Sequence, residues 1–293
     1  MPVVPVHDAA TLRDAGRSPA TPFAVLLADG SELGVSGLLR VLPGKRIVAE
    51  AQWHGQRVLA KLFVADGSAR HWAQEKKGIL ALQQAALETP ALLLAESLPR
   101  GGHVLLSTFL SDAESLAEHW IEVEGLPAGN PAALEVLRPA FALLGRMHAK
   151  GLVQDDLHFG NFLQAAGQWF VIDGDAVREV SPGQPLDEKT AVTNLAILLT
   201  QLPIAWNAHL TPLLEVYHAA GGRVFSCHTA QDERLVREVE RVRAWRLKDY
   251  LGKAGRECTL FKALRGVLRF SVLRRTRAAV LEPLLETLDH AIS

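Results

Sequence analysis

Apolar residues gather in short stretches in the first third of the chain and then change to a helical spacing. The stretches GLLRVLP, GKRIVAEAQW and HGQRVLAKLF begin at Gly37, are rich in Val, Ile and Leu, and are separated by Pro-Gly and His-Gly turns. This pattern predicts an antiparallel meander of three strands. Between residues 68 and 87 apolar residues recur at roughly helical spacing among charged ones, which predicts a helix after the meander.

Two more apolar stretches flank a Gly-Gly turn and predict a fourth and a fifth strand, which close a small first lobe near Phe109. Beyond Ser111 the spacing is mainly helical, and Gly151 follows one such segment as a helix cap. Residues 1–37 show no sustained period. We therefore expect an α+β fold with a loosely structured lead-in over residues 1–37, an antiparallel-sheet lobe over 38–110 and a mainly helical lobe over 111–293.

The composition is that of an ordinary globular protein. Of 293 residues, 48% are hydrophobic and 22% charged, and the formal net charge is -1. Two cysteines cannot form a disulfide framework, which favours a reducing compartment. The first residues lack the basic start and apolar run of a secretory signal, and no long uninterrupted apolar run is present. We expect a cytoplasmic protein.

The densest group of chemically useful side chains lies in two loops. The first loop carries Asp155, Asp156, His158 and Asn161, and the second carries Asp173 and Asp175. If the segments around Phe162 and Phe170 pair as a hairpin, Asn161 and Asp173 lie at the same open end and can bind one hard cation through oxygen atoms. Asp156 would then face whatever the cation holds. A carboxylate beside a magnesium-bound nucleotide is typical of phosphoryl transfer.

A lysine in an apolar strand is the second feature that indicates this chemistry. Lys61 follows Val-Leu-Ala, and a buried ammonium group is costly without an anionic partner. Glu75, on the following predicted helix, is such a partner, although it could instead pair with a neighbouring lysine at the surface. Glu50 is the competing carboxylate. A lysine and a glutamate paired between strand and helix hold nucleotide phosphates in protein kinases.

The loops VQDDLHFGNFL and FVIDGDAV resemble the catalytic and metal-binding loops of the protein-kinase-like superfamily. With the LPGKR turn, the VLAK strand and the HWAQE helix, they more closely resemble the lipopolysaccharide core kinase (Kdo/WaaP) family of Gram-negative bacteria. The resemblance implies a two-lobed fold that binds ATP between its lobes. It also implies one role for each matching residue: Asp156 as catalytic base, Asn161 and Asp173 as Mg²⁺ ligands, and Lys61, Glu75, Gly44 and Lys45 at the nucleotide.

The acceptor that the resemblance implies is a sugar hydroxyl of the lipopolysaccharide inner core, at the cytoplasmic face of the inner membrane. The adenine would be held by backbone groups near Ser107 to Leu110. Three departures from the family pattern keep other hypotheses open: Gln154 and Asp155 precede the catalytic aspartate, the turn over the phosphates has one glycine, and Asn194 stands where many relatives have an aspartate. A catalytically silent nucleotide-binding or scaffold protein and a kinase of a soluble small molecule remain alternatives.

The C-terminal region from Arg241 to Arg277 is strongly basic. It carries twelve Arg and Lys residues against two acidic residues, Asp249 and Glu257, with apolar residues interleaved. This pattern indicates either a solvated helix face or amphipathic helices that contact anionic lipid headgroups or phosphorylated sugars. Nucleic acid is a weaker choice, because aromatic residues are sparse and no recognition motif is present.

Overall fold

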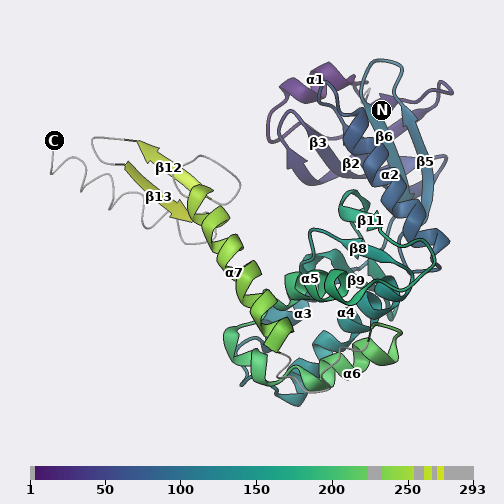
Figure 1. Ribbon diagram of the computed structural model, residues 1–293. Coiled ribbons are helices and arrows are strands. Elements are labelled where there is room, and N and C mark those ends of the chain that lie inside the picture. The colour runs from purple at the N-terminus through teal and green to yellow at the C-terminus, as the bar shows by residue number, and fades with distance from the viewer. Residues whose placement is uncertain (1–3, 224–232, 254–260, 266–268, 274–293) are drawn as a thin grey trace. The chain divides into compact units, whose positions relative to one another are not determined.

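The computed structural model describes residues 4–223, 233–253, 261–265 and 269–273 (Figure 1). The chain divides into two compact units, Met1–Glu233 and Arg234–Ser293. The first unit contains a sheet-rich lobe, drawn in purple and blue, and a mainly helical lobe, drawn in teal and green. The α+β fold expected from the sequence is therefore confirmed for this unit.

The first lobe is built on a six-stranded antiparallel sheet in the order β1-β2-β3-β4-β6-β5. The strands are β1 (Phe23–Leu26), β2 (Glu32–Leu42), β3 (Arg46–Trp53), β4 (Gln56–Phe63), β5 (Leu92–Ser97) and β6 (His103–Thr108), and the helix α2 (Ala69–Gln84) follows β4. Along β4, Val58, Ala60 and Leu62 are fully buried in the lobe's core. The intervening residues Leu59 and Lys61 therefore point to the opposite face, because side chains alternate along a strand.

The sheet begins earlier in the chain than the expected boundary between residues 37 and 38. That boundary falls inside β2, and β1 pairs with β2 from Phe23↔Val35 to Leu26↔Glu32. A short helix, α1 (Ala9–Asp14), precedes β1. Phe23 and Val35 are fully buried in the first lobe's core. Burial of these apolar side chains stabilises the end of the expected lead-in as part of the sheet.

The second lobe combines helices with short strands that carry the two polar loops. Its helices are α3 (Leu116–Val123), α4 (Pro131–Ala149), α5 (Glu188–Leu199) and α6 (Thr211–Ala219), with the 3-10 helices η1 (Phe159–Asn161), η2 (Gly174–Ala176) and η3 (Ile204–Ala208). Its strands are β7 (Glu114–Ser115), β8 (Leu152–Gln154), β9 (Phe162–Ala165), β10 (Gln168–Val171) and β11 (Val177–Glu179). The predicted hairpin is present, since β9 and β10 pair with Val171 opposite Phe162.

The second unit corrects the expectation of a helical lobe that runs to residue 293. It contains most of the helix α7 (Glu233–Lys253) and two paired strands, β12 (Phe261–Arg265) and β13 (Arg269–Leu273), where helices were expected. Short segments that can be read with either period are hard to assign from sequence. The rest of the basic region lies outside the described residues. In the described part of the chain, no helix combines the length and apolar character that crossing a bilayer requires.

Candidate active site

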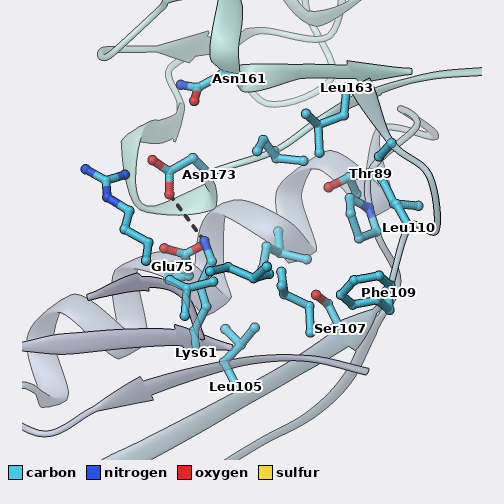
Figure 2. A pocket seen from close by; sticks show the side chains of 18 of the residues that line it. Lys61, Glu75, Thr89, Leu105, Ser107, Phe109, Leu110, Asn161, Leu163 and Asp173 are labelled. Atoms are coloured by element: carbon cyan, nitrogen blue, oxygen red, sulfur yellow. Dashed lines mark hydrogen bonds and ion pairs between the residues drawn. The ribbon is translucent and has the colours of Figure 1, made fainter. Parts of the chain in front are cut away.

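A cavity of about 390 Å³ lies between the sheet of the first lobe and the polar loops of the second. Figure 2 shows its two ends: Lys61, Glu75 and Asp173 gather on one side, and Thr89, Phe109 and Leu110 lie on the other. The lining is mostly apolar at the second end. Such a cavity suits a ligand with one flat apolar part and one highly charged part.

Lys61 reaches the cavity from the middle of the sheet. It lies on β4, opposite Val48 on β3 and Leu105 on β6, and its side chain is 13% exposed. Its Nζ donates a hydrogen bond to Oε1 of Glu75 and lies 3.3 Å from Oδ1 of Asp173. The structure thus brings Lys61, Glu75 and Asp173 together. The competing carboxylate, Glu50, does not pair with Lys61 but with Arg57.

The charges in this group support one another. Burial disfavours the charged form of Lys61, but the Glu75 and Asp173 carboxylates outweigh burial and raise its pKa. Burial also opposes the Asp173 anion, but Lys61 and Arg46 outweigh it and lower the pKa of Asp173. Complete burial raises the pKa of Glu75, against the effect of Lys61. The Glu75 anion therefore depends on its lysine partner.

Asp173 and Asn161 come from the two loops and both line the cavity. Asp173 has φ +70°, a left-handed conformation that costs a residue with a side chain on the order of 1 kcal/mol and is often found at functional sites. The Asn161 amide donates its Nδ2 to the Asp156 carbonyl at 2.8 Å, which leaves its oxygen available as a ligand. A carboxylate and an amide oxygen suit Mg²⁺, with water and phosphate oxygens completing its coordination.

A second group of carboxylates lies beside this pair. Glu75, Asp173 and Asp175 each offer an oxygen atom, and these atoms lie within 4.8 Å of one another. All three contact a protein cation, because Lys61 pairs with Glu75 and Asp173, and Arg46 contacts both Glu75 and Asp175. The trio is therefore balanced by protein cations and does not require a metal ion.

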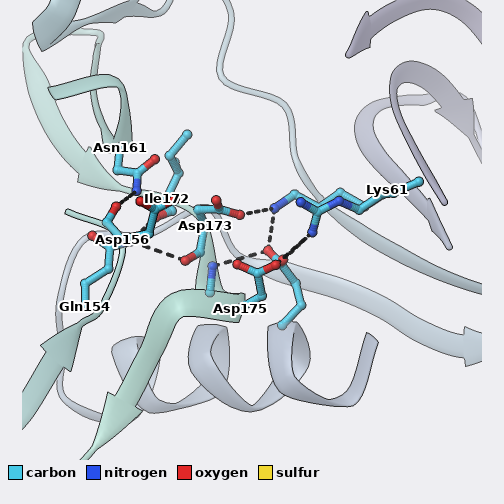
Figure 3. Close-up of polar contacts among 10 residues, drawn as sticks. Lys61, Gln154, Asp156, Asn161, Ile172, Asp173 and Asp175 are labelled. Atoms are coloured by element: carbon cyan, nitrogen blue, oxygen red, sulfur yellow. Dashed lines mark hydrogen bonds and ion pairs between the residues drawn. The ribbon is translucent and has the colours of Figure 1, made fainter. Parts of the chain in front are cut away.

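Asp156 lies exposed in the same loop as His158 and Asn161, which both line the cavity. Figure 3 shows the link from Asn161 to the backbone of Asp156. This bond fixes the loop and leaves the Asp156 carboxylate accessible. A carboxylate so placed can accept a proton from a hydroxyl group that approaches from solvent.

The residues that depart from the family pattern connect the two loops. Gln154 is fully buried, and its Nε2 donates to the carbonyl oxygens of Ile172 at 2.8 Å and Asp173 at 3.2 Å. Asn194, on α5, accepts from the Gln154 backbone N–H at 3.3 Å and donates to its carbonyl at 2.8 Å. Asn194 therefore braces the segment that leads into the Asp156 loop with an amide.

His148 and Tyr217 extend this hydrogen-bonded group into the core. His148 contacts Asn194 Oδ1 through Nε2 at 3.0 Å and the Tyr217 hydroxyl through Nδ1 at 2.8 Å. Burial lowers the pKa of His148 to about 4, so its ring is neutral at neutral pH. No local sequence pattern indicates these contacts, since the partners of His148 lie 46 and 69 residues away.

Two glycines allow α2 to touch the loop that carries Asp173 directly. A Cβ on Gly78 would lie 1.8 Å from the Gly174 carbonyl oxygen, and a Cβ on Gly174 would lie 2.6 Å from the Glu75 carbonyl oxygen. The Gly174 N–H also donates to Glu75 Oε1 at 3.2 Å. Backbone contact thus sets the position of the helix that carries Glu75 against the loop that carries Asp173.

The structure does not bring Gly44 and Lys45 into the cavity. Gly44 turns the β2–β3 hairpin with φ +66°, and Lys45 lines a separate hollow beside Asp175. The basic residues of this hairpin that do line the cavity are Arg40 and Arg46, which the sequence analysis missed. The alternation of side chains along a strand could have found Arg46, because Arg46 and Val48 lie two residues apart on β3.

A small antiparallel lobe, a helical lobe and a cavity between them with a lysine–glutamate pair together define a protein-kinase-like fold of the WaaP type. A solved structure of WaaP in complex with acyl carrier protein matches with a TM-score of 0.50 and 17% sequence identity, over 72% of this chain and 89% of that chain. The PknI kinase domain of Mycobacterium tuberculosis matches with a TM-score of 0.43 and 13% identity, over 70% and 95% respectively.

The likeness to solved structures concerns the fold. No family model matches the sequence, and none of the curated proteins matches it. The fold predicted from the resemblance to the WaaP family is therefore confirmed.

Proposed function

We propose that this chain is an ATP-dependent kinase that phosphorylates a sugar hydroxyl of the lipopolysaccharide inner core. One observation carries the proposal: Lys61 and Glu75 from the first lobe meet Asp173 and Asn161 from the second in a single cavity. The apolar end of this cavity suits an adenine ring, with backbone groups of residues 107–110 nearby. Its charged end suits phosphates.

Each residue has a definite part in the proposed transfer. Lys61 binds phosphate oxygens and is itself held by Glu75. The Asp156 carboxylate accepts the proton of the acceptor hydroxyl while the hydroxyl oxygen bonds to the terminal phosphorus. The bond from that phosphorus to the bridging oxygen breaks, and ADP leaves. Magnesium, bound by Asn161, Asp173 and nucleotide oxygens, would supply positive charge at the phosphates.

The proposed acceptor is a core sugar, and the candidate protein partner is acyl carrier protein. The sequence resemblance to lipopolysaccharide core kinases and the fold shared with WaaP support a core sugar as acceptor. Since that WaaP structure contains acyl carrier protein, the same carrier is a partner to test for this chain.

We place this reaction in the cytoplasm, at the face of the inner membrane. On α7, Trp245, Leu247 and Leu251 are 62%, 59% and 62% exposed beside basic residues, as expected for contact with anionic headgroups. Salt-sensitive sedimentation with anionic but not neutral vesicles is expected. Binding that ignores vesicle charge would contradict this contact.

Transfer of label from γ-labelled ATP tests the function. The chain is incubated with Mg²⁺ and envelope extract from a Gram-negative strain, and label is followed into the lipopolysaccharide fraction. We expect label with the wild type and a loss of about 10²-fold or more with Asp156→Asn, because the amide cannot accept the proton. ATP affinity should be retained in this variant.

Asp155→Asn is the matched control, because Asp155 is exposed in the same loop but pairs with Arg178. We expect it to retain transfer. Equal transfer by wild type and Asp156→Asn would contradict the catalytic assignment. ATP binding without transfer to this fraction would favour a kinase of a soluble substrate or a catalytically silent nucleotide-binding protein.

A further inference from the structure

Two arginine side chains from the β2–β3 hairpin line the cavity at its charged end. Arg40 lies on β2 opposite Val48, and Arg46 begins β3 opposite Leu42. The hairpin has one glycine at its tip, and neither Gly44 nor Lys45 lines the cavity. The backbone at this tip therefore offers no cradle for phosphates, whereas two guanidinium groups reach the same side of the cavity.

Both ion pairs of Arg46 are made by a single nitrogen, and its guanidinium group also lies over the ring of Phe63. Its Nη1 lies 3.3 Å from Oε2 of Glu75 and 3.1 Å from Oδ2 of Asp175, and its side chain is 14% exposed. Within the described part of the chain, its Nε and Nη2 make no hydrogen bond. A guanidinium group carries five N–H donors in a rigid fork, so Arg46 is oriented and still has donors for an anion.

Arg40 differs from Arg46 in being exposed. It forms no hydrogen bond or ion pair with any other described residue, yet it is close enough to help lower the pKa of Asp173. An unpaired arginine at the mouth of a cavity is free to turn toward an incoming anion. The pair thus offers one fixed and one adjustable guanidinium group.

The charges of the group indicate which ligand suits it. Lys61, Arg40 and Arg46 face the carboxylates of Glu75, Asp173 and Asp175, so the empty group is balanced. A divalent cation on Asp173 would leave a surplus of positive charge at this end of the cavity. The terminal phosphates of a nucleotide would neutralise that surplus, and guanidinium groups bind phosphate through two parallel hydrogen bonds.

We propose that Arg40 and Arg46 bind the terminal phosphates of the nucleotide and replace the backbone of a glycine-rich loop with side-chain donors. This inference rests on the proposed function. It assigns Arg46 two tasks, since the same side chain ties Glu75 to Asp175 and presents free N–H groups to the cavity.

The test compares two ligands that differ only in phosphate. Affinities for ATP and for adenosine, both in the presence of Mg²⁺, are measured by calorimetry on the full chain and on Arg40→Ala, Arg46→Lys and Lys45→Ala. The lysine variant is used because truncation of Arg46 would leave Asp175 without its cation, whereas Glu75 would keep Lys61. We expect Arg40→Ala and Arg46→Lys to weaken ATP about tenfold or more and to leave adenosine unchanged, since a charged hydrogen bond is lost.

Lys45→Ala is the matched control, because Lys45 is a basic residue of the same hairpin outside the cavity. It should bind ATP as the wild type does, and an equal loss there would overturn the assignment to the arginines. Equal weakening of ATP and adenosine would also overturn it, since the arginines would then act on the fold. If the wild type binds no ATP, the proposed function fails too; if the wild type and both arginine variants bind ATP alike, only this inference fails.

Discussion

Two groups of side chains hold the candidate active site, and they differ in charge. At the cavity, Lys61 joins the carboxylates of Glu75 and Asp173 (Figure 2). Behind the loop that carries Asp156, His148 and Asn194 belong to a buried group that is neutral at neutral pH. The first group can exchange a partner for an incoming ion. The second has no charge to exchange and therefore fixes the geometry of the loop whether or not a ligand is bound.

One residue joins the two groups. The Gln154 side chain donates to the carbonyl of Asp173, while the Asp173 carboxylate lies 3.3 Å from Lys61 (Figure 3). The backbone of Asp173 is thus held by the neutral group, and its side chain belongs to the charged one. The comparison predicts that changes in the charged group affect ligand binding most, whereas changes in the neutral group affect stability most.

The largest effect is expected for Asp173→Ala. This change removes the proposed Mg²⁺ ligand, so Mg²⁺ should no longer strengthen ATP binding, and transfer should fall about 10³-fold, comparable to the loss of a charge-stabilising group. Lys61 keeps Glu75 as its partner, so the free energy of unfolding should change little. Calorimetry with and without Mg²⁺ and urea unfolding measure the two quantities.

Asp175→Ala is the control for this variant. It removes a carboxylate from the same loop that pairs with Arg46 and not with Lys61. Magnesium dependence should survive in it. If Asp173→Ala keeps the magnesium dependence of the wild type, or if both variants lose it equally, the assignment of Asp173 as ligand is wrong.

A smaller effect, on stability, is expected for Asn194→Leu. Leucine has a similar volume but leaves the buried N–H and C=O of Gln154 and the Nε2 atom of His148 without their partner. Buried polar groups without partners cost about 1–3 kcal/mol each, so we expect a loss of about 3 kcal/mol in the free energy of unfolding. Urea unfolding at neutral pH measures it. A loss below about 1 kcal/mol would contradict a stabilising role for the neutral group.

The charged group could be predicted from the sequence more fully than the neutral one. Lys61 and Asp173 lie in short stretches whose pattern indicates a strand or a loop end, and an ionisable residue in an apolar strand requires a partner. The neutral group has no such local signal. The residues that bond to His148 and Gln154 come from separate helices, and only the folded chain brings them together.

The first lobe also contains a strand that has no clear local signal in the sequence. Strands β3 to β6 and the part of β2 from Leu38 follow clear apolar stretches and were predicted, whereas Phe23–Leu26 is a short segment in a region without sustained period. It becomes a strand because β2 offers a partner and the first lobe buries Phe23 and Val25 completely or nearly so. Tertiary burial thus decides the structure of a segment whose own pattern is weak.

The smallest effect is a change in pH dependence, and it tests whether the second group is neutral. Burial lowers the pKa of His148 from 6.5 to about 4, so between these values the unfolded chain binds more protons and stability falls as the pH falls. Between pH 7 and pH 5 this should cost the wild type about 2 kcal/mol that His148→Gln does not lose. Urea unfolding at both pH values gives the difference.

Exposed His71 provides the control, and His71→Gln should lose as much stability between pH 7 and pH 5 as the wild type does. If His148→Gln loses as much stability as the wild type, His148 is not held neutral in the folded chain, and the contrast between the two groups fails at this residue.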